Sequence, residues 1–285
     1  MPARCTIGVD IGTSSSKGVL VDAAGAILAS ATVAHDVQRP RTGWVEMDGR
    51  IWWDEFVQIS RELLAQASTA QLEVEITAVG VSGMGPCVLL ADEHDEPVRP
   101  AILYGVDTRA TAQIDRMTAE LGVDDITRVG GSTLTTQAGG PKIVWIADEE
   151  PAAYAAARRL FMPASWLARH LTGAYVLDHQ SASQVSPLYD VEGEQWHTAN
   201  WDRYAPDIEA PRLLWAGDIA GTVTDAAAAA TGLPAGIPVI AGTIDAWSEA
   251  VSVGAHELGD LMLMYGTTMF LVATGAETLR TPSMW

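Results

Sequence analysis

Apolar and polar residues alternate along the first third of the chain in a way that predicts three consecutive β-strands. The stretches 6–9, 17–22 and 26–33 are rich in β-forming residues, and they are separated by a run of small polar residues and by a tight Ala-Ala-Gly turn. Short apolar stretches bounded by turn residues are typical of strands joined by hairpins. We therefore expect a meander with one face free to be covered by helices.

The pattern then changes to a helical period. Asp48 is expected to cap a helix, because apolar residues recur after it every three or four positions: Trp52, Phe56, Ile59, Leu63 and Ala67. A buried strand at 76–81 and a strand at 87–91 follow, and no clear period marks residues 178–218. Further helices are predicted over 107–121, 141–148, 151–157, 164–171 and 226–230.

A second group of strands is predicted near the end of the chain. The run Leu-Pro-Ala-Gly-Ile-Pro at 233–238 interrupts regular structure, so we place a domain boundary after residue 236. Beyond it, strands at 239–241 and 261–264 each lead into a Gly-Thr turn, and a third strand covers 269–273. A strand ending in a Gly-Thr turn thus occurs at both ends of the chain. The two segments resemble each other weakly in pattern, but they are not a sequence repeat. The mixture of strands and helices indicates an α/β protein.

Composition and charge narrow the function classes. The chain has 285 residues, of which 48% are hydrophobic, enough for two domains and a sizeable core. Its 36 acidic and 17 basic residues give a formal net charge of −19. This charge argues against nucleic acid as a partner, because non-specific binding there relies on clustered Lys and Arg. A phosphate compound could bind only where backbone amides, a local cation or a metal ion offset the negative electrostatic potential of the protein.

The cellular location is expected to be the cytoplasm. Cys5 and Cys87 both lie in apolar runs, where small buried thiols of a reducing compartment are the simplest interpretation. Asp10 and Lys17 interrupt the first apolar run, so we expect no secretory signal. No apolar stretch is long enough to span a bilayer, and no membrane partner is expected.

The segment 10–17, Asp-Ile-Gly-Thr-Ser-Ser-Ser-Lys, has the chemistry of a phosphate-binding turn. Gly12 lets the backbone approach a ligand closely, and Thr13 and Ser14 add hydroxyl groups. Asp10 is suited to hold Mg²⁺, directly or through water, and Lys17 supplies a cation. The spacing is not that of a Walker loop. An ordinary hairpin with an acidic strand end is the alternative interpretation.

Two further turns carry candidate chemistry. Asp245 ends the run Gly-Thr-Ile-Asp at 242–245, after a predicted strand, where a carboxylate can accept a hydroxyl proton during phosphoryl transfer. A helix N-cap is the alternative role for Asp245. Gly266, Thr267 and Thr268 offer amides and hydroxyls for a terminal phosphate, or they form a simple tight turn.

These motifs occur in an order that resembles the FGGY family of carbohydrate kinases. The resemblance runs from the first predicted strand nearly to the end of the chain, and each motif is short but their succession is specific. The matching segments are Asp-Ile-Gly-Thr-Ser at 10–14, Gly-Trp-Val-Glu at 43–46, Trp-Trp at 52–53, Asp-Thr-Arg at 107–109, Gly-Gly-Pro-Lys-Ile-Val-Trp at 139–145, Gly-Thr-Ile-Asp at 242–245 and Gly-Thr-Thr at 266–268.

The resemblance implies an actin-like, ribonuclease-H-like duplicated fold in which ATP and a sugar meet between two domains. Residues 1–236 would form the N-terminal, sugar-binding domain. Residues 237–285 would begin a nucleotide-binding domain that is incomplete, and we therefore expect that these 285 residues alone do not turn over ATP. The implied ligands are ATP, Mg²⁺ and a sugar or polyol, and a homodimer is an open alternative to a monomer.

The resemblance also assigns roles residue by residue. Asp245 matches the catalytic base, which also contacts the sugar, and Asp10 matches the aspartate that binds metal and phosphate. The phosphate-binding residues would be Gly12, Thr13, Ser14, Lys17, Gly266, Thr267 and Thr268. The sugar-binding residues would be Met84, Gly85, Asp107, Arg109 and Gln137.

Two departures from the family pattern concern the sugar that would accept the phosphate. Xylulose kinases have Met-His where this chain has Met84-Gly85, and they have an amide side chain where it has Ala246. Both changes remove polar groups that could hold sugar hydroxyls, so a pentulose such as xylulose is favoured as a class but not fixed. The alternative to a kinase is a degenerate relative that binds a sugar without transferring phosphate, against which the retained Asp245 speaks.

Overall fold

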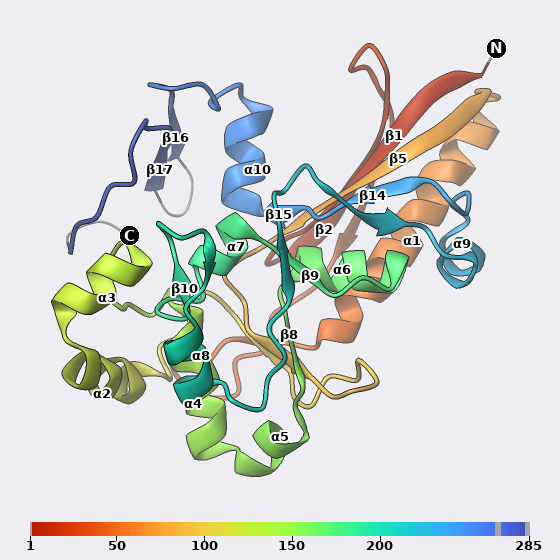
Figure 1. Ribbon diagram of the computed structural model, residues 1–285. Coiled ribbons are helices and arrows are strands. Elements are labelled where there is room, and N and C mark those ends of the chain that lie inside the picture. The colour runs from red at the N-terminus through yellow and green to blue at the C-terminus, as the bar shows by residue number, and fades with distance from the viewer. Residues whose placement is uncertain (1, 266–268, 283–285) are drawn as a thin grey trace.

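The computed structural model describes residues 2–265 and 269–282, and its architecture is a central β-sheet with helices packed on it (Figure 1). The predicted meander is confirmed. Strands β1 (Ala3–Ile11), β2 (Ser15–Asp22) and β3 (Ile27–Ala34) pair in antiparallel order. Their register sets Asp10 opposite Lys17, so the ends of the predicted phosphate turn face each other.

The central sheet has seven strands and brings distant segments together. Its order is β13-β14-β5-β1-β2-β3, with β15 paired to the end of β5. Strand β5 runs parallel to β1, and both β14 and β15 run parallel to β5. The carboxyl ends of these parallel strands therefore meet at one edge of the sheet, which is where ligands bind in many α/β proteins. The bounds are β5 (Val74–Gly83), β13 (Ile219–Thr222), β14 (Pro238–Ile240) and β15 (Thr243–Ile244).

Helix α1 (Gly49–Thr69) covers one face of the meander, as its apolar spacing predicts. Asp48 caps it, because its side chain accepts a hydrogen bond from the backbone N–H of Arg50. The helix comes so close to β2 that a Cβ on Gly18 would lie 2.3 Å from Cγ2 of Ile59. Glycine at position 18 thus permits this helix–sheet packing. Helices α6 (Pro163–Thr172) and α9 (Asp225–Thr231) complete the layer.

A second apolar core lies beside the sheet and is largely helical (Figure 1). The predicted helix over 107–121 begins only at Thr111, because the side chain of Asp107 holds the preceding turn. The stretch without a clear period, 178–218, forms short elements that cover this core. The elements of this region are β4 (Glu46–Met47), β6 (Leu89–Ala91), β7 (Ala101–Ile102), α2 (Thr111–Leu121), α3 (Val123–Gly130), α4 (Gly139–Glu149), α5 (Pro151–Ala156), β8 (Arg159–Phe161), β9 (Val176–Asp178), α7 (His179–Ser183), β10 (Tyr189–Asp190), β11 (Gln195–Trp196), α8 (Thr198–Tyr204) and β12 (Arg212–Leu214).

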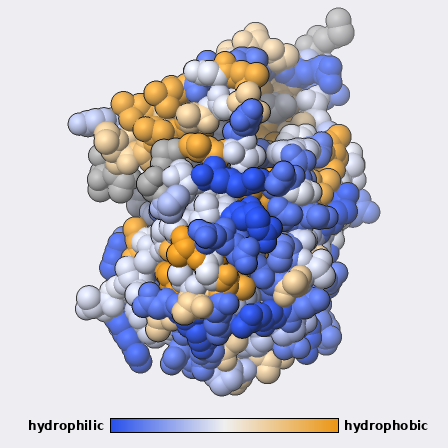
Figure 2. All heavy atoms as spheres, turned by 60° about the vertical axis from the view of Figure 1, so that its left-hand side comes forward, coloured by the Kyte–Doolittle hydropathy of each residue, from blue (hydrophilic) through white to orange (hydrophobic). Residues whose placement is uncertain are grey.

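The end of the chain forms a helix and a hairpin above the sheet edge (Figure 1). Helix α10 (Asp245–Ser252) leads to β16 (Leu261–Tyr265), which pairs in antiparallel order with β17 (Met269–Ala273). Apolar side chains of this part stay exposed, and Figure 2 shows them gathered on one side of the molecule; they include Val251, Leu261, Leu263, Met269 and Leu271. Within the described ranges, no helix combines the length and apolar character needed to cross a membrane.

Candidate active site at the edge of the sheet

Asp10 lies near the end of β1, between Lys17 on β2 and Ser82 on β5. Its Oδ1 accepts a hydrogen bond of 2.6 Å from the hydroxyl of Ser82 on β5. Burial raises the pKa of the Asp10 carboxyl, and the Ser82 hydrogen bond and the positive charge of Lys17 oppose that rise. Asp10 and Lys17 line a hollow of about 470 Å³ between the sheet and α10. The carboxyl predicted to bind the metal and the predicted cation Lys17 therefore share one hollow.

The turn at Gly12 is tightly closed. The N–H of Gly12 donates to the carbonyl of Ser15 over 3.1 Å, and a Cβ on Gly12 would lie 2.8 Å from that oxygen. Any larger residue would push the turn open. The hydroxyl of Thr13 lies 3.1 Å from the hydroxyl of Tyr104, which links the turn to the neighbouring pocket.

A polar cluster of His35, Glu55 and Ser16, which no sequence motif marks, contacts this turn. Nε2 of His35 lies 3.0 Å from the carbonyl oxygen of Gly12, and its Nδ1 lies 2.9 Å from Oε2 of Glu55. The same carboxylate accepts a hydrogen bond from Ser16. His35 follows β3 and Glu55 lies on α1, so only the packing of helix on sheet brings the two together.

Asp245 is the first residue of α10 and follows β15 directly. Its Oδ1 accepts a 2.8 Å hydrogen bond from the N–H of Ala246. Burial raises the pKa of the Asp245 carboxyl to about 7, and the negative charges of Asp10 and Glu249 act in the same direction. A carboxyl with this pKa exchanges protons near neutral pH, which is a property of general bases.

The strand before Asp245 is anchored from the side. The hydroxyl of Thr243 donates to Oδ2 of Asp178 over 2.7 Å, and the N–H of Ser181 donates to the same oxygen. Asp178 is buried, and burial raises its pKa to about 6. Asp178 therefore fixes the backbone that presents Asp245.

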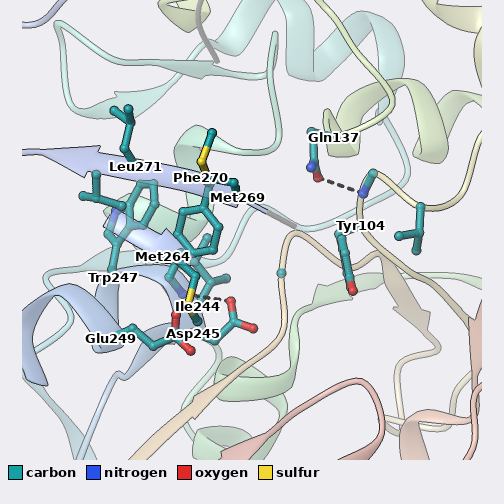
Figure 3. Close-up of a pocket in the computed structure, with 15 residues that line it drawn as sticks. Tyr104, Gln137, Ile244, Asp245, Trp247, Glu249, Met264, Met269, Phe270 and Leu271 are labelled. Carbon is teal, nitrogen blue, oxygen red and sulfur yellow. Dashed lines mark hydrogen bonds between the residues drawn. The ribbon is translucent and has the colours of Figure 1, made fainter. Parts of the chain in front are cut away.

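A cavity of about 480 Å³ opens beside Asp245 (Figure 3). Tyr104, Gln137, Asp245 and Glu249 supply its polar side chains. Gln137 is held in place because its Oε1 accepts a 2.8 Å hydrogen bond from the N–H of Gly105. Most of the other lining is apolar and includes Ile244, Ala246, Trp247, Met264, Phe270 and Leu271. A pocket of this size, with few convergent polar groups, suits a small polar ligand.

Only some of the predicted sugar-binding residues line the cavity. Gly85, Gln137 and Asp245 line the cavity, with Asp10 close enough to influence Asp245 electrostatically. Met84 is fully buried next to Gly85. The predicted phosphate turn at 266–268 lies outside the described residues.

Asp107 and Arg109 form a buried ion pair and do not line the cavity. Both side chains are 0% exposed, and the Arg109 guanidinium also contacts Glu46 over 2.6 Å. The guanidinium lies over the rings of Trp44 and Trp145, at 4.2 and 4.9 Å from their centroids. In this structure the pair holds the segment before α2, because Oδ2 of Asp107 also accepts from the N–H of Val45.

Tyr104, Trp247 and Glu249 line the cavity and are not among the site residues predicted from the sequence. Trp247 and Glu249 follow Asp245 on α10, and the spacing of four residues between Asp245 and Glu249 places them on one helix face. That spacing was a usable signal. Tyr104 has no comparable signal, because its place depends on the turn that Gln137 and Thr136 hold at Gly105.

Residues 5–252 match the model of the N-terminal domain of the FGGY family of carbohydrate kinases. The chain belongs to this family. It is 33% identical over 261 residues to a xylulose kinase of Streptomyces coelicolor, covering 87% of this chain and 50% of that protein. It is 28% identical over 290 residues to a glycerol kinase of Leifsonia xyli, covering 97% of this chain and 55% of that protein.

Solved structures of FGGY kinases have the same fold. The crystal structure of xylulose kinase from Rhodospirillum rubrum superimposes with a TM-score of 0.92 at 28% identity, covering 98% of this chain and 57% of that one. The predicted actin-like α/β fold is thereby confirmed. The chain spans about half the length of the relatives it matches.

Proposed function

We propose that the protein transfers the γ-phosphoryl group of ATP to a hydroxyl of a sugar or polyol, with a pentulose such as xylulose as the first acceptor class to test. The observation that carries this proposal is Asp245, a buried carboxyl with a pKa raised to about 7 at the polar end of a cavity. Membership of the FGGY family supports the same reaction. A role in binding alone would not require a group poised to exchange protons.

In the proposed reaction, Asp245 accepts the proton of the acceptor hydroxyl as the oxygen attacks phosphorus. Phosphoryl transfer has a loose transition state, so positioning and charge stabilisation supply most of the catalysis. Gly12, Thr13, Ser14 and Lys17 would hold the phosphates, together with Gly266, Thr267 and Thr268. Gln137 and Tyr104 would orient the acceptor.

Asp10 would hold Mg²⁺, which neutralises phosphate charge when it is bound. The donor chemistry fits, because Mg²⁺ in phosphoryl-transfer sites commonly uses one or two carboxylates together with substrate phosphates and water. No group of three or more His, Cys, Asp or Glu side chains forms a metal site among residues 2–265 and 269–282. We therefore expect the ion to bind with the nucleotide.

Turnover is proposed to require the remainder of a second domain, because the matched relatives are about twice as long as this chain. The division at residue 236, the homodimer and the cytoplasmic location stay predictions. The complete protein is this chain together with any polypeptide that supplies the rest of that domain.

The direct test is ADP release by the complete protein with ATP, Mg²⁺ and a panel of pentuloses, hexuloses and polyols. An acceptor at 100 times its Kd should also add about 2.7 kcal/mol to the free energy of unfolding. Acceptor-dependent ADP release would support the proposal. Stabilisation by a sugar without ADP release would instead indicate a binding protein.

Activity is expected to rise with pH through about 7. A base with its pKa at about 7 is protonated at lower pH, so kcat/KM should fall up to tenfold for each pH unit below that value. Stability should change in the opposite direction. A raised folded-state pKa means that the Asp245 contribution to stability is complete below its unfolded pKa and is lost as pH rises through about 7. A pH–rate profile and melting curves test both trends, and a rate that is flat between pH 5 and 8 would contradict the base role.

The replacement Asp10→Ala is expected to raise the Mg²⁺ concentration needed for half-maximal activity by about 10–100-fold, as loss of a group supporting a metal typically does. Acceptor affinity should change much less, because Asp10 does not line the cavity beside Asp245. The measurement is the initial rate over a Mg²⁺ titration. The control Ser82→Ala removes only the hydrogen bond to Asp10. An unchanged Mg²⁺ dependence would exclude the proposed role of Asp10.

A further inference from the structure

The turn that would hold the phosphates contains backbone donors without a partner. The N–H of Gly12 donates to the carbonyl of Ser15, but within residues 2–265 and 269–282 no backbone carbonyl accepts from the N–H of Thr13 or of Ser14. Thr13 is half-buried and Ser14 is exposed. Unpaired N–H groups in a turn can bind an anion, provided that they point toward it. The orientation of the peptide group between Gly12 and Thr13 therefore matters for phosphate binding.

This orientation is not fixed by the local sequence, because glycine adopts backbone angles that other residues avoid. His35 fixes it instead. Nε2 of His35 lies 3.0 Å from the carbonyl oxygen of Gly12, and this nitrogen donates because a carbonyl oxygen only accepts. In a planar trans peptide the C=O and N–H bonds point in opposite directions. The Thr13 N–H therefore points away from His35, and rotation of the peptide would break the hydrogen bond.

His35 is itself held in place by the surrounding structure. Its backbone N–H donates to the carbonyl of Ser14 over 3.1 Å, and its Nδ1 lies 2.9 and 3.1 Å from the two carboxyl oxygens of Glu55. The side chains of His35 and Glu55 are only 6% and 10% exposed. Either Nδ1 donates to the Glu55 carboxylate or it accepts a proton from the carboxyl. In both forms Nε2 keeps the hydrogen that it donates to Gly12.

We propose that His35 is a positioning residue for nucleotide binding. It acts through the Gly12 carbonyl to keep the Thr13 N–H directed at the phosphates of ATP, and Glu55 fixes the orientation of its ring. Without the His35 hydrogen bond, the peptide group can rotate and turn its carbonyl oxygen toward the phosphates, which repel it. This inference rests on the proposed kinase function and assigns a role to residues outside the phosphate turn.

Two substitutions that keep opposite ends of the imidazole test this role. The amide nitrogen of Gln can occupy the place of Nε2, whereas the shorter Asn reaches only the place of Nδ1. His35→Asn should raise the KM for ATP of the complete protein by about 10-fold or more, as the loss of one hydrogen bond to a charged group does. His35→Gln should stay much closer to wild type. The KM for the acceptor should change much less, because His35 does not line the cavity beside Asp245.

Two further measurements separate this effect from a loss of structure. Calorimetric titration with Mg·ADP measures nucleotide affinity without turnover, and His35→Asn should weaken it as it raises the KM for ATP. His170→Ala is the matched control, because its ring also packs against α1, 5.1 Å from the ring of Trp53, and its Nε2 has no hydrogen-bond partner among the residues described. It should lower the melting temperature and leave the KM for ATP unchanged.

The outcomes distinguish this inference from the proposed function. If His35→Asn and His35→Gln have the same KM for ATP, raised or unchanged, the role of His35 is wrong while the kinase function stands. An equal rise in the KM for ATP and for the acceptor in His35→Asn would also overturn that role. If the wild-type protein releases no ADP with any acceptor, the function fails, and Mg·ADP affinity still decides the role of His35. A wild-type protein that does not bind Mg·ADP would overturn both.

Discussion

Asp245→Asn is expected to lower kcat of the complete protein by about 10²–10⁴-fold, the usual contribution of a general base. The amide has nearly the same shape as the carboxyl, and its oxygen can still accept the hydrogen bond from Ala246 N–H. It has no capacity to take up the acceptor proton at neutral pH. The variant should therefore fold and bind ligands but transfer phosphate poorly. The measurement is single-turnover ADP formation with saturating ATP and acceptor.

Two further readouts make the Asp245→Asn test specific. Acceptor binding, followed by thermal shift, should stay within several-fold of wild type. Stability above pH 7 should increase relative to wild type, because the variant removes a buried negative charge that Asp10 and Glu249 repel. Glu249→Gln is the matched control on the same helix face, and it should reduce kcat far less. A near-wild-type kcat for Asp245→Asn would assign the base to another residue.

Arg109→Ala is expected to cost about 3–5 kcal/mol of unfolding free energy, because it leaves the fully buried carboxylate of Asp107 without its ion-pair partner, whereas Glu46 keeps its contact with Arg99. The packing of the guanidinium between Trp44 and Trp145 is lost as well. The measurement is chemical denaturation of the purified variant.

An exposed ion pair provides the control for Arg109→Ala. Arg128 and Asp125 are 61% and 66% exposed and 3.1 Å apart, so Arg128→Ala should change stability by no more than about 1 kcal/mol. Equal losses for both variants would contradict the buried-pair interpretation. A large rise in acceptor KM for Arg109→Ala with little loss of stability would support the contact with sugar that the family resemblance implies.

Much of the fold follows from local patterns. The meander, α1 with its Asp48 cap and the strand at 74–83 are each marked by residue periodicity and turn chemistry. The short elements within 178–218 are not, because they are held by contacts with the second core and too few residues in each show a period. The helix predicted from Asp107 starts later because the Asp107 side chain binds Arg109 and the backbone of Val45.

The candidate site was predictable in its chemistry but not in its shape. Asp10 and Asp245 are predicted from their turns, and the parallel pairing of β15 and β1 with β5 brings the two turns to one edge. The contact of His35 with Gly12 and the link from Thr13 to Tyr104 depend on distances between remote segments. No local pattern encodes such distances.

Asp245 has a second consequence for the molecule because it is the first residue of α10. A negative charge in the first turn of a helix interacts favourably with the helix dipole, typically by about 0.3–1 kcal/mol. When the carboxyl takes up a proton in the proposed reaction, that interaction is lost. Strand β17 packs against the same helix. Protonation of Asp245 would therefore remove a stabilising interaction from the helix that carries both the proposed base and the packing surface of β17.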